Sequence, residues 1–118
     1  MIKNKSEIIK YELINGIGKV IEFDDLGDVF KGEYLNGKRN GKGREFDGLV
    51  NEIIFEGEYL NGFRHGYGKE YYANCKTEPI FEGEYLKGLR WNGKGKEYSG
   101  MNNIKIMVEY KNGEKIKF

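Results

Sequence analysis

The sequence has little of what builds cross-linked, metal-bound or membrane-spanning proteins. Cys75 is the only cysteine among 118 residues, which excludes an internal disulfide and any multi-cysteine zinc site. No apolar run is long enough to span a bilayer, and no signal-peptide segment follows Met1. The formal net charge is only +1, so the basic excess of a dedicated nucleic-acid-binding protein is missing. We therefore expect a cytoplasmic protein that binds no nucleic acid.

Proline is equally scarce, since Pro79 is the only one, whereas glycine and aromatic residues are abundant. The chain holds 18 Gly, nine Tyr, seven Phe and one Trp. Glycine favours tight turns, and aromatic residues favour strands. The composition therefore predicts a β protein with frequent turns.

An internal repeat organises the chain. Its copies are GEYLNGKRNGKGREF from Gly32, GEYLNGFRHGYGKEY from Gly57 and GEYLKGLRWNGKGKEY from Gly83, which start 25 and 26 residues apart. The third copy has one extra residue near Trp91. Degenerate copies at 10–23 and 108–118 flank these three, and an Asn-Gly pair in each marks a tight hairpin turn. Atypical end copies are typical of repeat proteins.

Each copy begins with a period-two pattern that is typical of a half-buried strand. Phe30, Gly32 and Tyr34 alternate with Lys31 and Glu33, and the later copies repeat this alternation. The pattern of the second strand does not show which of its two faces is buried. We predict an all-β fold: a single domain, 1–118, in which stacked hairpins form an elongated single-layer antiparallel sheet. The expected hairpins span about 8–23, 29–46, 54–72, 80–98 and 104–118.

The repeats resemble the MORN family, whose copies read as a Gly-Glu-aromatic strand, a Gly-Lys-Arg turn, then Gly-x-Gly and a second strand. The match is carried by Gly32-Glu33-Tyr34, Gly37-Lys38-Arg39 and Gly41-Lys42-Gly43, and by their counterparts in the next two copies. The longer period and the extra residue at Trp91 depart from the family pattern. The resemblance implies a MORN-type repeat solenoid that acts as a non-catalytic scaffold, self-associates in some cases, and is found with membranes or the cytoskeleton.

No constellation of residues supports an enzyme, a cofactor site, a metal site or a small-molecule substrate. His65 is interpreted as a solvated turn residue, although a general base is the alternative. Cys75, beside Lys76, is interpreted as an incidental loop residue rather than a reactive thiol. Glu33 and its counterparts Glu58 and Glu84 recur with the repeat, so we expect a row of solvated or salt-bridged charges.

The basic turns are the main candidate for a binding surface. In register they would form a rim able to contact anionic lipid headgroups, or one that only keeps the protein soluble. The candidate lipid contacts are Lys38, Arg39, Lys42, Arg64, Arg90 and Lys94.

The aromatic residues favour a core, but an open sheet could leave some rings free for protein contacts. The candidate partner contacts are Trp91, Tyr34, Tyr59 and Tyr85. We expect a protein-interaction module, which could self-associate through open strand edges near 8–13 and 115–118. The alternative is a module peripheral to an anionic membrane.

Overall fold

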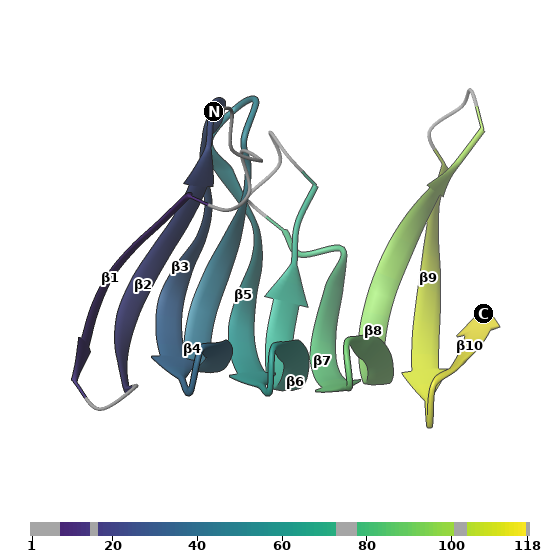
Figure 1. The fold of residues 1–118 in the computed structure, drawn as a ribbon. Helices are drawn as coiled ribbons and strands as arrows, with labels where there is room; N and C mark the ends of the chain where they lie inside the picture. The colour runs from purple at the N-terminus through teal and green to yellow at the C-terminus, as the bar shows by residue number, and fades with distance from the viewer. Residues whose placement is uncertain (1–7, 15–16, 73–77, 101–103, 118) are drawn as a thin grey trace.

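In the computed structural model, residues 8–14, 17–72, 78–100 and 104–117 form one antiparallel sheet whose strands follow chain order. Figure 1 shows the hairpins side by side, with β1 and β10 at opposite ends. The strands are β1 Ile8–Ile14, β2 Ile17–Asp24, β3 Gly27–Leu35, β4 Lys38–Asp47, β5 Glu52–Leu60, β6 Phe63–Glu70, β7 Phe81–Leu86, β8 Leu89–Ser99, β9 Ile104–Lys111 and β10 Glu114–Lys117.

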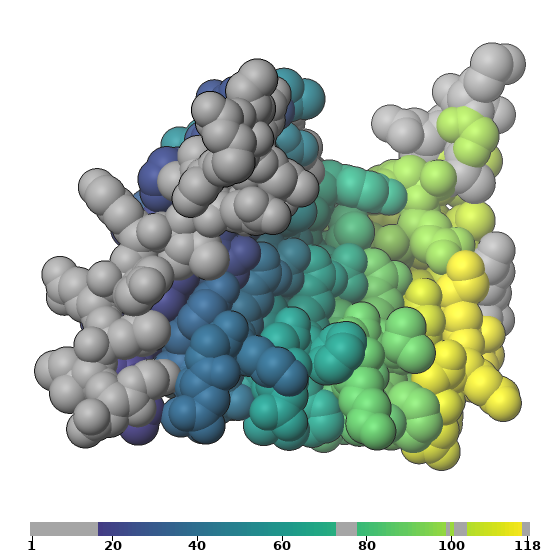
Figure 2. Space-filling view, viewed as in Figure 1, coloured from purple at the N-terminus to yellow at the C-terminus, as the bar shows by residue number. Residues whose placement is uncertain are grey.

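The sheet is elongated, as the sequence predicts. Its principal extents are 47 × 29 × 24 Å, and its radius of gyration is 15.8 Å. A compact domain of this length has a radius of gyration of about 13.5 Å. Figure 2 shows the successive hairpins as contiguous bands along the long axis. The all-β, single-sheet fold is therefore confirmed.

Two-residue turns join the strands within the repeats. Asn36 and Gly37 have φ values of 52° and 81°, and the turns at 61–62, 87–88 and 112–113 repeat this geometry. Positive φ at both positions suits a primed hairpin turn, which explains the Asn-Gly pairs. The sequence predicted that the basic residues of each copy lie in a turn, and that prediction is wrong. Residues 38–42 already belong to β4, so the basic residues there lie on a strand.

A bulge in the second strand replaces the expected turn in the β3–β4, β5–β6 and β7–β8 hairpins. Gly32 pairs with Gly43 and Tyr34 pairs with Arg39, so β4 carries two extra residues against β3. The β5–β6 hairpin has the same bulge. In the third hairpin, Gly83 pairs with Gly93 and Tyr85 with Arg90, which leaves one extra residue. By its position in the repeat, Gly95 corresponds to Gly43 and Gly68, yet the residue that pairs with Gly83 is Gly93. The insertion near Trp91 therefore shifts the pairing by two residues.

A row of glycines crosses the sheet. Gly32, Gly43, Gly57, Gly68, Gly83 and Gly93 are successive cross-strand partners. A Cβ atom on Gly43 would lie 2.5 Å from the Phe30 ring, and one on Gly57 would lie 2.6 Å from the Gly68 Cα. The rings therefore pack directly on the backbone, which only glycine permits.

The core lies on the face that carries these rings, which we call the aromatic face. Phe30, Phe55 and Phe81 are fully buried there, and Tyr59 and Tyr85 fill the space between them. Successive Phe and Tyr rings meet edge to face at 5.1–5.6 Å, a favoured geometry for aromatic pairs. We call the opposite face, which carries Lys31 and Glu33, the charged face.

Candidate functional site: a polar ladder and the opposite charged face

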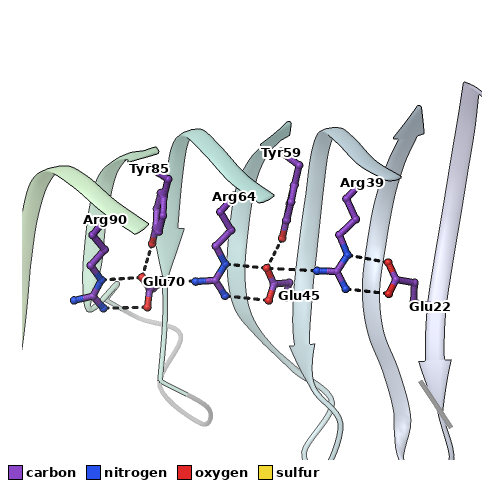
Figure 3. Close-up of polar contacts among 8 residues, drawn as sticks. All are labelled: Glu22, Arg39, Glu45, Tyr59, Arg64, Glu70, Tyr85 and Arg90. Atoms are coloured by element: carbon purple, nitrogen blue, oxygen red, sulfur yellow. Dashed lines mark hydrogen bonds and ion pairs between the residues drawn. The ribbon is translucent and has the colours of Figure 1, made fainter. Parts of the chain in front are cut away.

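Each repeat arginine binds a glutamate of the preceding hairpin. Arg64 donates two hydrogen bonds to Glu45, at 2.8 and 3.0 Å. Arg39 binds Glu22 and Arg90 binds Glu70 with the same distances. Figure 3 shows the pairs in line across the strands. This fork geometry is the strongest form of ion pair available to arginine.

A tyrosine hydroxyl adds a third hydrogen bond to each glutamate. Tyr34 donates to Glu22 at 2.7 Å and Tyr59 to Glu45 at 2.6 Å, and Tyr85 repeats the contact with Glu70. We call these nine residues the polar ladder: Glu22, Glu45 and Glu70; Arg39, Arg64 and Arg90; Tyr34, Tyr59 and Tyr85.

The ladder shifts the pKa values of its members in consistent directions. Burial raises the pKa of Glu45, but hydrogen bonds from Arg64 and Tyr59 outweigh it and leave the pKa below its ordinary value; Glu22 and Glu70 behave alike. Burial and the bond to Glu22 raise the pKa of Tyr34 to about 12. The pKa values of Tyr59 and Tyr85 are raised for the same reasons. Ionised glutamate and neutral tyrosine are thus the forms that the fold stabilises.

The arginines also cover the core. The Arg64 guanidinium lies 4.1 Å from the Phe55 ring centroid and 5.9 Å from that of Tyr85. Arg39 and Arg90 lie over Phe30 and Phe81 in the same way. A weakly hydrated guanidinium suits such stacking better than an ammonium group does. Arginine therefore takes the place of a second layer above the phenylalanine rings.

This arrangement corrects the placement of three candidate lipid contacts. Arg39, Arg64 and Arg90 were expected on an exposed turn rim, yet they lie on the aromatic face, bound to carboxylates. Of the candidate lipid contacts, Lys38, Lys42 and Lys94 are exposed.

Sequence reasoning missed the ladder glutamates, although a signal was present. Glu45 and Glu70 each stand two residues after a second-strand glycine, and Glu97 does so after Gly95. Lys115 takes the arginine position of the last hairpin and lies 2.6 Å from Glu97. The recurrence of an acidic residue at this spacing would have marked the partner of the repeat arginine.

The recurring glutamates of the first strands also have a structural role. Glu33 Oε1 accepts a hydrogen bond from the backbone N–H of Lys42 at 2.8 Å, and Glu58 does the same for Tyr67. Gly41 and Gly66, in the same bulges, have φ values of 97° and 94°. Both glutamates therefore cap a bulge, a role that the expected row of solvated or salt-bridged charges did not include. In the third hairpin, Glu84 instead accepts from the side chain of Asn92, at 3.2 Å.

His65 connects neighbouring hairpins. Its Nδ1 accepts the backbone N–H of Lys87 at 3.4 Å, in the next turn. Asn40 and Asn92 accept equivalent bonds from Asn61 and Asn112, at 3.2 and 3.0 Å. The position therefore holds a hydrogen-bond acceptor between hairpins, and His65 supplies it.

The four candidate aromatic contacts are not equally accessible. Tyr59 and Tyr85 are only 4% and 3% exposed and donate to ladder glutamates, so they are corrected to core residues. Tyr34 is half-buried. Trp91 is half-buried as well, and its ring lies against Gly113 of the next hairpin. Cys75 lies outside the described residues.

The charged face carries a groove across β3–β6. Its volume is about 510 Å³, and Gly43 and Gly57 contribute to its wall. The side chains that line it are Lys31, Lys42, Arg44, Glu56, Glu58, Tyr67 and Lys69. A second depression of about 450 Å³ lies over β7–β9, and the Tyr67 hydroxyl donates to Glu82 in its wall. The cations of the first groove outnumber its carboxylates by two.

Apolar side chains stand beside this groove at the turn ends of the hairpins. We call Ile17, Leu35, Leu60, Phe63 and Leu89 the apolar strip; their exposures run from 37% to 69%. Leu60 pairs with Phe63 and lies two residues beyond Glu58, so both share the charged face. A large exposed apolar surface is typical of a contact surface. Sequence reasoning did not single out this strip.

Two searches of the described residues concern other classes of site. No group of three or more His, Cys, Asp or Glu side chains gathers there as a metal site would require. None of these residues forms a helix of the length and apolarity needed to cross a bilayer.

Comparison with known proteins identifies the repeat. The MORN repeat family matches residues 30–48 and 55–74, which contain the β3–β4 and β5–β6 hairpins. A search of curated proteins gives no match. The family is generally one of protein or membrane interaction modules and is generally non-catalytic. The chain therefore contains MORN repeats at residues 30–48 and 55–74, stacked with its other hairpins in a single sheet.

Proposed function

We propose that this chain is a non-catalytic protein-interaction module that works in the cytoplasm, with its contact surface on the charged face. The observation that carries the proposal is the difference between the two faces. On the aromatic face, arginine, glutamate and tyrosine side chains satisfy one another and bury the phenylalanine rings. On the charged face, exposed apolar side chains stand beside an open groove.

A scaffold needs a rigid surface more than a reactive one, and the ladder supports rigidity. Each ladder contact joins one hairpin to the next, so the hairpins form a continuous body rather than independent units. A partner that binds across several hairpins would therefore meet a preorganised surface, which lowers the entropic cost of association.

The competing proposal is a module that binds anionic membranes through its basic residues. Lys38, Lys42 and Lys94 are the exposed members of that set, and Glu56 and Glu58 stand in the same groove as Lys42. The neighbouring carboxylates weaken the field that a membrane would meet. We therefore favour the hypothesis of a protein-interaction module.

The test is selection of a random display library of peptides on the immobilised full chain, with vesicle binding measured in parallel. We expect peptides that bind saturably and keep binding at physiological salt. At that salt concentration, interactions between exposed charges more than about 8 Å apart are largely screened. Vesicles of phosphatidylcholine with phosphatidylserine should bind weakly and lose binding as salt rises. Strong vesicle binding with no selected peptide would overturn the proposal in favour of the membrane module.

A further inference from the structure

We infer that the partner on the charged face is an extended protein segment in which acidic and apolar residues alternate, laid across β3–β6. This inference rests on the proposed function and specifies its ligand. It is carried by three features of the face: the shape of the groove, an unbalanced cluster of cations, and the adjacent apolar strip.

The shape of the groove suits an extended chain. It crosses four strands, and strands lie about 4.8 Å apart, so an occupant of about five or six extended residues would span it. Gly43 and Gly57 lie at the floor of the groove, where a side chain at either position would point to the aromatic face instead. A ligand backbone can approach the sheet closely at such positions.

Among the described residues, three of the four groove cations have one carboxylate within 4.0 Å, and two of those carboxylates, Asp28 and Glu82, lie outside the groove lining. Lys31 and Arg44 are directly opposite on β3 and β4, and like charges in that position destabilise a sheet. Arg44 lies 4.0 Å from Glu56, and Lys31 lies 3.3 Å from Asp28. Lys69 lies 3.9 Å from Glu82. Lys42 forms no ion pair with the residues that the structure describes. Carboxylates of a bound segment would relieve this repulsion, so the groove favours an acidic ligand.

The apolar strip sets the second requirement. Leu60 and Phe63 lie on the side of the groove away from Lys31 and Arg44, two residues beyond the groove residue Glu58. In an extended segment, alternate side chains point to opposite sides. One set would meet Lys31 and Arg44, and the other would cover Leu60 and Phe63. Only a segment that alternates acidic and apolar residues satisfies both sides.

The direct test measures peptide binding to the full chain by fluorescence anisotropy. The probe is a labelled peptide of about ten residues that alternates Glu and Leu, a length that spans the groove. The comparison peptides are one that alternates Lys and Leu and one with the same Glu and Leu residues in two blocks. We expect the alternating Glu–Leu peptide to bind most tightly and the Lys–Leu peptide to bind least.

Variants locate the site. Lys42→Glu should weaken binding of the Glu–Leu peptide about tenfold or more, because it places a carboxylate where the ligand's own lies. Phe63→Ser should weaken it by a comparable factor, and that loss should persist at high salt. Lys111→Glu is the matched control, since Lys111 is exposed and lines neither depression. Circular dichroism of each variant verifies that the sheet is intact.

The outcomes separate this inference from the proposed function. Equal binding of the Glu–Leu and Lys–Leu peptides, or a Lys42→Glu variant that binds like the wild type, overturns the inference. If library peptides of another composition bind instead, the inference falls and the interaction module stands. If no designed or selected peptide binds, both fall. If binding of phosphatidylserine vesicles is weakened by Lys42→Glu and Phe63→Ser to the same extent, the ligand of this face is a membrane surface, which also overturns the inference.

Discussion

Replacing Arg64 with alanine tests the polar ladder most directly, because this one side chain joins two hairpins and covers the core. It holds Glu45 through two hydrogen bonds and stacks on Phe55. The two partners of the ion pair are shielded, with side-chain exposures of 24% and 19%. Without Arg64, the Glu45 carboxylate keeps the Tyr59 hydroxyl and an Arg39 nitrogen at 3.9 Å.

The magnitude follows from these contacts. Removing one partner of a fully buried ion pair destabilises a protein by about 3–5 kcal/mol. Partial exposure and the remaining partners of Glu45 reduce the expected loss to about 2 kcal/mol. Loss of the stacking on Phe55 adds about 1 kcal/mol. We therefore expect Arg64→Ala to lower the free energy of unfolding by about 3 kcal/mol and the Tm by about 10 °C.

The assay is urea denaturation followed by far-ultraviolet circular dichroism, with Arg44→Ala as the matched control. Arg44 is the same residue type on the other face, its side chain is 59% exposed, and its ion pair with Glu56 is at 4.0 Å. Its removal should change the free energy of unfolding by no more than about 0.5 kcal/mol. Arg64→Lys should lower the free energy of unfolding by an intermediate amount, because an ammonium group keeps the charge but cannot donate the two parallel hydrogen bonds of a guanidinium. Equal losses for Arg64→Ala and Arg44→Ala would refute the ladder as the element that joins hairpins.

Three further predictions follow from the same geometry. The ladder glutamates have pKa values below the ordinary 4.5, so the stability that they contribute is present above pH 4.5 and lost as the pH falls through their folded values. The ladder tyrosines have raised pKa values, about 12 for Tyr34, so their contribution is lost as the pH rises above about 10. Denaturation measured across pH, with tyrosine ionisation followed by ultraviolet absorbance, checks both predictions. A free energy of unfolding that does not fall below pH 4.5 would contradict the prediction for the glutamates. Gly57→Ala should lower the free energy of unfolding by more than about 3 kcal/mol, because its Cβ would lie 2.6 Å from backbone atoms. Gly62→Ala should lose only about 1 kcal/mol, since its φ is 91° but no atom lies within 4 Å of the added Cβ. The chemical denaturation midpoints decide between them. His65→Asn should leave stability within about 0.5 kcal/mol, whereas His65→Ala should lose about 1 kcal/mol, because Asn keeps the acceptor for Lys87; equal melting curves for the two variants would argue against the role of that bond.

The fold could be read from the sequence because its determinants are local and repeated. Alternation around Phe30, Gly32 and Tyr34 requires strands with one buried face, and the Asn-Gly pairs specify two-residue turns. Three copies in register make stacking of hairpins the simplest way to bury that face. The strand lengths were harder to predict, because the bulge after Arg39 looks like a loop when only the sequence is read.

The candidate site was largely hidden, since it depends on which side chains meet across hairpins. A basic residue near a turn is typical of a solvated rim, so Arg64 was assigned to one. In the structure its partner, Glu45, stands in the preceding hairpin, 19 positions away in sequence. The sequence also left open which face of the second strand is buried. In the structure the Phe46 ring lies on the charged face beneath Lys31, while the neighbouring Glu45 faces the core.

The sequence by itself therefore determined that this protein is a stack of β-hairpins with aromatic residues on one face of the first strands. Periodicity and turn chemistry act over a few residues, and each copy states them again. Only the tertiary structure decided how the arginines and glutamates are used. The cross-strand register and the bulges bring Arg39, Arg64 and Arg90 over the phenylalanine rings and within reach of carboxylates from the preceding hairpin. A bidentate ion pair depends on positions in space to within a fraction of an ångström, and such positions are settled only when neighbouring hairpins pack.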